Sequence, residues 1–255
     1  MQTISIVLAT FNEEANLPDF FKSIGDLADQ VVVIDGSSTD RTVEIAKKFG
    51  AKVLVTTNKP IFHINKQKAI DMATKDWVLQ LDADERVSKE LKEEISHLTK
   101  PSGRGSQLNG YWISRKNWFL GRFLMKGGQY PDYTLRLYRR GKGRLPQKSV
   151  HEQAEVSGKV GYLKYPLLHY PYKNFNMYLE KWNRYTSLIR DELQEQKIGY
   201  NPIMALKYLV ILPILWFGMT YIRHKGFMDS WQGFVFSFFS SIRFPVGYVK
   251  YLGKV

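Results

Sequence analysis

Two aspartates separated by one residue follow an apolar run near the middle of the first half of the chain. Trp77, Val78, Leu79, Gln80 and Leu81 lead directly into Asp82-Ala83-Asp84. Two positions apart on an extended chain, both carboxylates share one face. Carboxylate oxygens are the ligands that Mg²⁺ and Mn²⁺ prefer, and these cations also accept oxygens from a diphosphate. The pair is therefore either a metal site or an ordinary polar strand end, and its place in the fold must decide.

Polar residues also follow two earlier apolar runs. Thr10, Asn12 and Glu13 come after residues 4–9, and Asp35 ends residues 31–34. In a sheet of parallel strands the ligand crevice lies beyond the carboxyl ends of the strands. We expect these residues to converge with Asp82 and Asp84 on one rim, which favours the metal site.

The elements that would position this rim alternate between short apolar strands and helices. Strands covered by helices on both faces read as continuous apolar runs, so the pattern predicts an α/β fold with a mainly parallel sheet. Asn12 is expected to cap a helix with Glu13 in its first turn, and Asp40 a helix that runs through Lys48. The other expected elements are strands at 4–9, 31–34, 52–55, 77–81, 110–114 and 134–138, a helix at 63–74, and helices after 174.

Composition narrows the class of protein. The chain has 255 residues, a net charge of +13 and no cysteine, so thiolate chemistry is absent and a polyanionic partner is expected. A nucleic-acid binder would explain the charge but not the gathered acids. Residues 8–14 contain no glycine, which argues against a dinucleotide oxidoreductase and against a sugar-phosphate nucleotidyltransferase, the alternative from another class. Residues 1–6 show no secretory signal.

Three segments in order resemble a known family. "SIVLATFNEEANLPDFFKSI", "VVVIDGSSTDRTVEIAKKFGAKV" and "WVLQLDADERVS" are similar to the nucleotide-binding half of family 2 glycosyltransferases, which have the GT-A fold. "YPDYTLRLYRRGKGR" and "VHE" extend the resemblance to about residue 170. The variant resembles bacterial lipopolysaccharide-core glucosyltransferases. The resemblance implies inverting transfer of a sugar, with glucose expected, from a UDP-sugar with Mg²⁺ or Mn²⁺ bound.

The resemblance also implies roles for single residues on the donor side. Asp84 would be the direct metal ligand, with His151 as a second metal or diphosphate contact. The family's Gly-rich Ala-Arg-Asn segment is replaced here by residues 64–69. Lys66 or Lys68 of this segment is therefore expected to contact the diphosphate. The nucleotide would be held by Thr10, Asn12, Glu13, Asp35 and Asp82, with Asp35 on the uracil.

The acceptor side needs a base for the attacking hydroxyl, and a carboxylate suffices when a metal handles the charge of the leaving diphosphate. Asp132, in Tyr-Pro-Asp-Tyr, lies at the family's base motif, and Glu152 is the competitor. Arg136 and Arg139 are expected either to contact phosphates of the acceptor or to form a solvated basic edge. The expected acceptor is a lipid-linked phosphorylated saccharide such as lipopolysaccharide inner core, or else another lipid-linked or polyprenyl-phosphate acceptor.

Two apolar stretches near the end of the chain carry membrane signals. Residues 208–222 fall short of the roughly 20 that span a bilayer, and Pro213 interrupts them. Basic and aromatic neighbours favour an interfacial or re-entrant attachment to an anionic membrane surface, on the cytoplasmic face of a bacterial inner membrane. Spanning, or a helix-bundle or dimer contact, is the alternative. We therefore expect a donor half at 1–100, an acceptor half at 101–173 and a membrane-associated region at 174–255.

Overall fold

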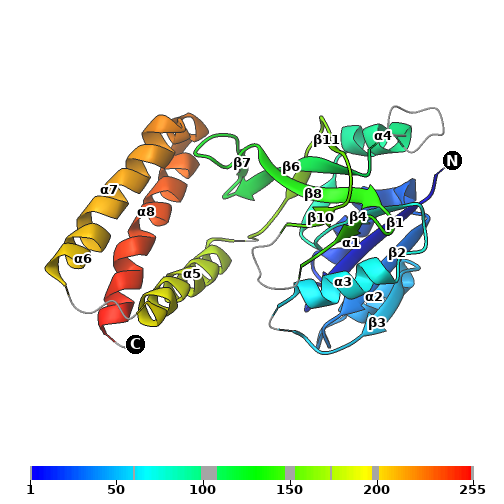
Figure 1. Ribbon diagram of the computed structural model, residues 1–255, viewed down its shortest axis with the longest axis horizontal. Helices are drawn as coiled ribbons and strands as arrows, with labels where there is room; N and C mark the ends of the chain where they lie inside the picture. The colour runs from blue at the N-terminus through cyan, green and yellow to red at the C-terminus, as the bar shows by residue number, and fades with distance from the viewer. Residues whose placement is uncertain are drawn as a thin grey trace. The chain divides into compact units, whose positions relative to one another are not determined.

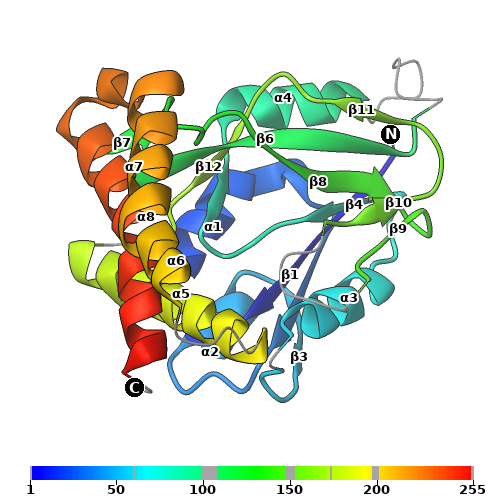
Figure 2. The same cartoon turned by 60° about the vertical axis from the view of Figure 1, so that its left-hand side comes forward.

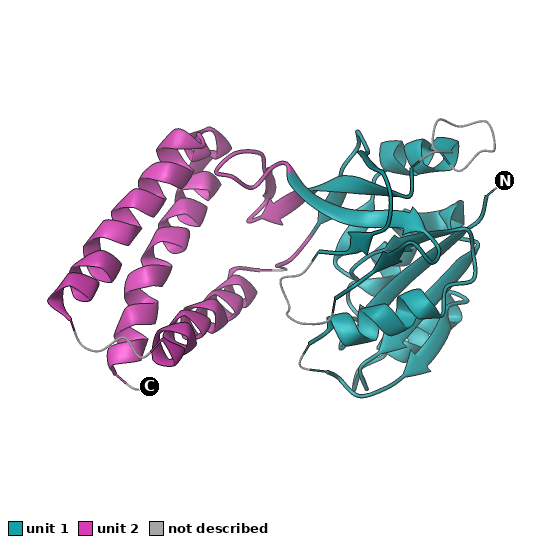
Figure 3. Cartoon of the chain, viewed as in Figure 1, with its two compact units in different colours: residues 1–115, 132–169 teal, residues 116–131, 170–255 magenta. Residues whose placement is uncertain are grey.

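The structure is a computed structural model that describes residues 2–59, 61–98, 108–146, 153–172, 174–196 and 201–253. It divides into two compact units (Figure 3). The sheet unit comprises residues 1–115 and 132–169, and the helical unit comprises 116–131 and 170–255. The three-part division expected from the sequence stays a prediction.

The sheet unit is built on a mixed sheet (Figure 1). Its order is β3-β2-β1-β4-β8-β6-β12-β5. Strands β3, β2, β1 and β4 run parallel to one another, and β8 lies antiparallel to both of its neighbours, β4 and β6. The strands are β1 Ile4–Thr10, β2 Gln30–Asp35, β3 Lys52–Val55, β4 Trp77–Gln80, β5 Glu85–Val87, β6 Gly110–Phe119, β8 Asp132–Arg139, β11 Val160–Tyr162 and β12 Leu167–His169. A separate ribbon pairs β9 Gly143–Arg144 with β10 Glu155–Val156.

Alternating side chains of the central strands divide between two cores, because successive residues of a strand point to opposite faces. Ile6 and Leu8 of β1 face a core shared with α1 Leu17–Ile24, α2 Thr42–Lys48 and α4 Lys89–Leu98. Val7, between them, faces the other core with α3 His63–Asp71. Helices on both faces confirm the predicted α/β class.

The expected helix start at Asn12 is wrong. Asn12 has a φ of +56°, in the left-handed region, and α1 begins at Leu17. The side chain of Asn12 instead accepts a hydrogen bond from the backbone N–H of Thr39 at 2.9 Å. The polar segment after β1 is therefore a loop fixed to the loop after β2. Its asparagine serves that loop rather than a helix.

The helical unit holds the apolar end of the chain and one hairpin of β6, formed with β7 Arg122–Leu124. Its helices are α5 Phe175–Glu195, α6 Pro202–Leu206, α7 Leu212–Phe217 and α8 Ser230–Leu252. Wide turns at residues 207–211 and 218–223 join α6 and α7 into one continuous helical segment, Pro202–Arg223. Such turns accommodate a proline within a helix, so Pro213 does not end this one. The segment has 22 residues and a mean hydropathy of 1.8, long and apolar enough by composition to cross a membrane.

Candidate active site

A cavity of about 240 Å³ opens beside the carboxyl end of β4. Strands β4, β6 and β8 and helix α3 supply its walls. Among the residues that line it are His63, Lys66, Gln80, Asp82, Arg115, Thr134 and Arg136. The sequence predicted Lys66, Asp82 and Arg136 as site residues, and the structure brings these three together.

Lys66, Asp82 and Arg136 form one ionic cluster. The Lys66 ammonium pairs with Oδ1 of Asp82, and Nη2 of Arg136 donates to Oδ2 of Asp82 at 2.7 Å. Burial alone would raise the pKa of Asp82, but the positive charges of Lys66 and Arg136 outweigh it and hold that pKa well below its usual value. Asp82 is therefore ionised at neutral pH.

Glu85, for which the sequence pattern predicted no role, extends this cluster. Its side chain is completely buried. Oε1 of Glu85 accepts from Nη2 of Arg136 at 2.8 Å and lies 3.5 Å from Nη1 of Arg115. Oε2 accepts from the backbone N–H of Asp82 at 2.9 Å. Glu85 thus fixes the turn that carries Asp82 and Asp84.

Arg115 continues the series of alternating charges to Asp132. Nη2 of Arg115 donates to Oδ2 of Asp132 at 2.7 Å, and the two residues face each other in the β6–β8 register. Lysine, aspartate, arginine, glutamate, arginine and aspartate therefore follow one another without a break from α3 to β8. The sequence offered no signal for Arg115, because only the pairing of β6 with β8 reveals its partner.

The arginines of β8 do not form the solvated basic edge considered above. Arg136 is only 7% exposed because it points into the acidic cluster, where Nη1 also donates to Oε1 of Gln80 at 2.6 Å. The guanidinium of Arg139 lies over the ring of Trp77, 4.7 Å from its centroid, and Nε donates to the carbonyl of Leu108. Contact of either arginine with an acceptor phosphate stays a prediction.

Asp84 lies beside a histidine that the sequence did not single out. Nε2 of His169 is 3.4 Å from Oδ2 of Asp84. Strand β12 pairs with β5 so that His169 faces Glu85, which brings this histidine to the turn that carries Asp84. His151 and Glu152, the expected metal contact and the alternative base, lie outside the described residues. Within the described ranges, His, Cys, Asp and Glu side chains form no group of three that could hold a metal.

The loops after β1 and β2 form a second polar group. Oδ2 of Asp35 accepts from Oγ1 of Thr10 at 2.9 Å and from Oγ of Ser38 at 2.6 Å. The backbone N–H of Glu13 donates to Oγ1 of Thr42 at 2.7 Å. Thr10 and Asp35, which end β1 and β2, and Asn12 and Glu13 in the loop after β1 therefore form one bonded group at the carboxyl ends of the two strands, as the sequence predicted. Arg86 ties these loops to the acidic turn, because Nη1 donates to the carbonyl of Ala83 and Nη2 to that of Asn16.

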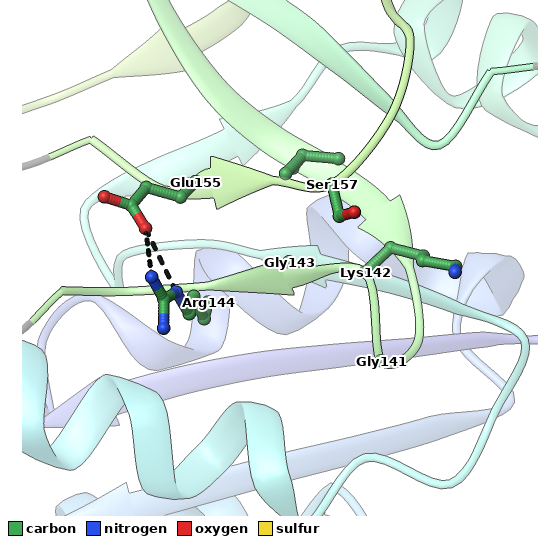
Figure 4. A pocket seen from close by; sticks show the side chains of 7 residues that line it. Gly141, Lys142, Gly143, Arg144, Glu155 and Ser157 are labelled. Carbon is green, nitrogen blue, oxygen red and sulfur yellow. Dashed lines mark hydrogen bonds and ion pairs between the residues drawn. The ribbon is translucent and has the colours of Figure 1, made fainter.

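A second concave surface lies at the β9–β10 ribbon (Figure 4). Arg144 and Glu155 form an ion pair of 2.8 Å across it, and Lys142 points away from that pair. The side chains of Arg144 and Glu155 are 74% and 54% exposed, so the pair is solvated and worth little. The candidate site is accordingly the cavity beside β4.

Comparison with known proteins decides the family. The family model "Glycosyl transferase family 2" matches residues 5–155, more than half of the chain. The chain belongs to glycosyl transferase family 2. The matched range includes the acidic turn, both polar loops and the strands that carry Arg115 and Asp132. This membership makes the protein a glycosyltransferase and confirms the GT-A fold.

Two similar glycosyltransferases align with nearly the whole chain. A lipopolysaccharide core biosynthesis glycosyltransferase, LpsC of Rhizobium meliloti, is 28% identical and aligns with 94% of this chain and 91% of its own. An uncharacterised glycosyltransferase of Rickettsia typhi is 29% identical over 92% of this chain and 82% of its own. The crystal structure of TarS from S. aureus matches with a TM-score of 0.50 and 19% identity, over 88% of this chain and 45% of TarS. TarS shares the fold.

Proposed function

We propose that this family 2 glycosyltransferase moves a sugar, with glucose as the first candidate, from a UDP-sugar to a lipid-linked phosphorylated saccharide such as lipopolysaccharide inner core. The observation that carries the proposal is the unbroken series of charges that joins Asp82, at the donor loops, to Asp132. It holds one carboxylate for the donor and one for the acceptor in a single group. The likeness to LpsC, a lipopolysaccharide core biosynthesis glycosyltransferase, supports the class of acceptor.

The proposed mechanism is a single inverting displacement. Asp132 takes the proton from the attacking hydroxyl of the acceptor while the nucleoside diphosphate leaves from the opposite face of the sugar. Arg115 is a positioning residue, because Nε and Nη2 fix one carboxylate oxygen of Asp132 while Nη1 faces Glu85. Asp132 is part exposed, its side chain at 33%, so an incoming hydroxyl has access to it.

The donor contacts follow from the two polar loops and the cluster. Asp35 would bind the uracil, with Thr10, Asn12 and Glu13 around the nucleotide. Lys66 and Asp82 line the cavity side by side, where an ammonium and an anchored carboxylate can hold the diphosphate and its neighbouring sugar hydroxyls. The site of action is proposed to be the cytoplasmic face of a bacterial inner membrane.

Asp84 and His169 fit a divalent cation. A carboxylate and an imidazole that are 3.4 Å apart present an oxygen and a nitrogen to one point, and Mg²⁺ or Mn²⁺ completes its shell with diphosphate oxygens and water. When bound, the cation would neutralise charge on the leaving diphosphate. We therefore propose His169 as the histidine of the metal site in place of His151.

Transfer from a panel of UDP-sugars to purified lipopolysaccharide precursors, with Mn²⁺, with Mg²⁺ and with EDTA, tests the function. Asp132→Asn should abolish transfer while UDP-sugar binding, measured by calorimetry, stays within about twofold. Asp84→Asn should lose metal-dependent donor binding. Lys142→Met, on the exposed turn between β8 and β9, is the control. Transfer by Asp132→Asn at the wild-type rate would disprove the assignment of the base, and a chain that binds no UDP-sugar would disprove the donor class.

A further inference from the structure

The outer face of the hairpin formed by residues 202–223 and α8 is apolar and open. In Figure 1 and in Figure 2, the segment formed by α6 and α7 runs alongside α8, and α5 packs against α8. Only 6% of the most apolar window of 202–223 is buried, so this helix is not the core of the helical unit. Its most exposed apolar side chains are Ile203, Leu206, Ile214, Leu215 and Ile222, each more than half exposed. Apolar side chains exposed along the length of a helix mark an interaction surface.

The segment and the turn after it are also positively charged. Lys207, Arg223 and Lys225 are exposed, and Asp229 is the one acid between residues 201 and 253. Asp229 is only 2% exposed, and its carboxylate accepts hydrogen bonds from the backbone N–H groups of Met125 and Lys126, at 3.1 and 2.7 Å. The face therefore offers cations without an exposed acid, which matches the headgroups of anionic lipids.

The opposite side of α8 is covered by a polar helix, α5. Nε1 of Trp182 donates to the carbonyl of Phe239 at 2.8 Å, and Nζ of Lys250 donates to Oδ1 of Asn183 at 2.6 Å. At Gly247 the two helices touch so closely that an added Cβ would lie 2.7 Å from Ile189. The ionisable residues of α5 are Glu180, Lys181, Arg184, Arg190, Asp191, Glu192 and Glu195.

The turn between the two arms of the hairpin is also held by polar contacts. The backbone N–H of Gly127 donates to the carbonyl of His224 at 2.9 Å, beside the two amides that bind Asp229. Gly226 and Gly233 meet so closely that a Cβ on Gly233 would lie 1.9 Å from the Gly226 carbonyl oxygen. A loop before β8 therefore clamps this turn, and hydrogen bonds join residues 182–187 of α5 to Phe239 and Lys250 of α8.

We propose that the helical unit lies flat on an anionic lipid bilayer, with the outer face of residues 202–223 in the interface and α5 facing water. If 202–223 spanned the bilayer, α8, α5 and its seven ionisable side chains would have to enter the hydrocarbon with it, which is strongly unfavourable. In the plane of the interface the apolar side chains are buried while Lys207 and Arg223 reach the headgroups. The inference deepens, and rests on, the proposed membrane location of the enzyme.

Absence of native cysteine permits a direct test on the full chain. Single cysteines replace Ile214, on the outer face, and Tyr185, an exposed residue of α5. Each variant is treated with a membrane-impermeant maleimide, with and without vesicles that contain phosphatidylglycerol. In the flat arrangement the vesicles protect Ile214→Cys and leave Tyr185→Cys reactive. Protection of both would show insertion across the bilayer, and protection of neither would show that this face does not bind lipid; each overturns the proposal.

The charge requirement is tested by vesicle flotation. Lys207→Glu combined with Arg223→Glu should lower binding about tenfold or more, because each surface cation contributes to attraction toward anionic lipid. The matched control, Lys52→Glu combined with Lys142→Glu, changes the same net charge in the sheet unit and should bind as wild type. Equal loss in both would overturn the assignment of the face. If light scattering shows dimers without lipid, and the Ile214→Cys thiol is then protected from the maleimide, the face binds a second copy of the chain and the proposal is overturned.

These assays need neither donor nor acceptor. A wild-type chain that binds vesicles but transfers no sugar would disprove the proposed reaction and leave the surface intact. A chain that transfers sugar to a delipidated acceptor but binds no vesicles would do the reverse.

Discussion

Arg115 donates two hydrogen bonds to a single oxygen of Asp132, from Nη2 at 2.7 Å and from Nε at 3.0 Å. The planar guanidinium makes this possible, since two of its N–H groups point in the same direction. This pair sets the direction in which the proposed base faces its substrate.

Arg115→Lys should therefore lower kcat about 10–100-fold and leave the KM for the UDP-sugar nearly unchanged, because an ammonium preserves the charge but not the fixed orientation of Asp132. Steady-state kinetics with varied donor measure the effect. Arg144→Lys, at the solvated ion pair with Glu155, is the control and should retain the wild-type kcat. A change in donor KM alone would contradict the positioning role.

Glu85→Gln should destabilise the sheet unit by about 3 kcal/mol, since it leaves the buried guanidinium of Arg136 and the half-buried guanidinium of Arg115 with less negative charge. Denaturant unfolding followed by circular dichroism measures the loss. Glu155→Gln removes the acid of an exposed pair and should change stability by less than about 1 kcal/mol. Equal effects of the two substitutions would show that burial of the Glu85 cluster is unimportant.

The lowered pKa of Asp40 predicts that the free energy of unfolding decreases in acid. Burial acts to raise its pKa, but hydrogen bonds from the hydroxyl and N–H of Thr42 and the N–H of Glu14 outweigh that effect, so the pKa lies below its usual 3.8. A carboxyl with a lowered folded pKa contributes stability at pH values above about 4, and this contribution is lost as the pH falls through the folded pKa. In Asp40→Asn the free energy of unfolding should therefore decrease less as the pH falls below about 4. Denaturant unfolding midpoints of the wild type and the variant measure this, and midpoints that decrease in parallel would contradict the prediction.

His169→Gln should raise the Mn²⁺ concentration for half-maximal transfer about tenfold or more, because one of two proposed protein ligands loses its imidazole nitrogen. The activity is titrated with the metal after treatment with a chelator. His97→Gln, on the exposed side of α4, serves as the control. An unchanged metal titration in the His169 variant would return the role to His151.

Gly233→Ala should destabilise the helical unit by about 1–3 kcal/mol, because the methyl group would collide with the backbone at Gly226. Gly218→Ala meets nothing within 4 Å and should stabilise the unit by about 0.5–1 kcal/mol, through helix propensity. Thermal unfolding of both variants decides. A stabilised Gly233→Ala would show that the clamp at the turn is loose.

The parts of the site that could be predicted from sequence are those set by local pattern. Asp35 and Asp82 follow apolar runs that form parallel strands, and parallel strands bring their carboxyl ends to one edge. Arg115, Glu85 and His169 could not be found this way. Their partners depend on the pairing of β6 with β8 and of β12 with β5, which joins distant segments and leaves no periodic signal. Asn12 misled the prediction because the same side chain that caps helices also fixes left-handed turns.

At the apolar end of the chain, the sequence predicted an interruption where the structure has a continuous helix. Its composition indicated a membrane segment, but Pro213 led to an expected break where the helix continues through two wide turns. Proline is a strong signal for a helix end only when no neighbouring turn can take up its missing hydrogen bond. Hydropathy alone could not separate a spanning helix from a flat one, because the difference lies in the polar helix α5 packed along α8.

Residues 116–131 leave the sheet unit, contribute β7 and the clamp on Asp229 to the helical unit, and return at Asp132. The helical unit is thus assembled from two separate pieces of the gene. A recombination event that exchanged only the region after residue 170 would strand the inserted piece against a foreign hairpin, without Asp229 to accept its amides. An intact hairpin of this kind is therefore expected to be exchanged together with the segment that immediately precedes Asp132, so that in evolution the helical unit and the strand that carries Asp132 are inherited as one.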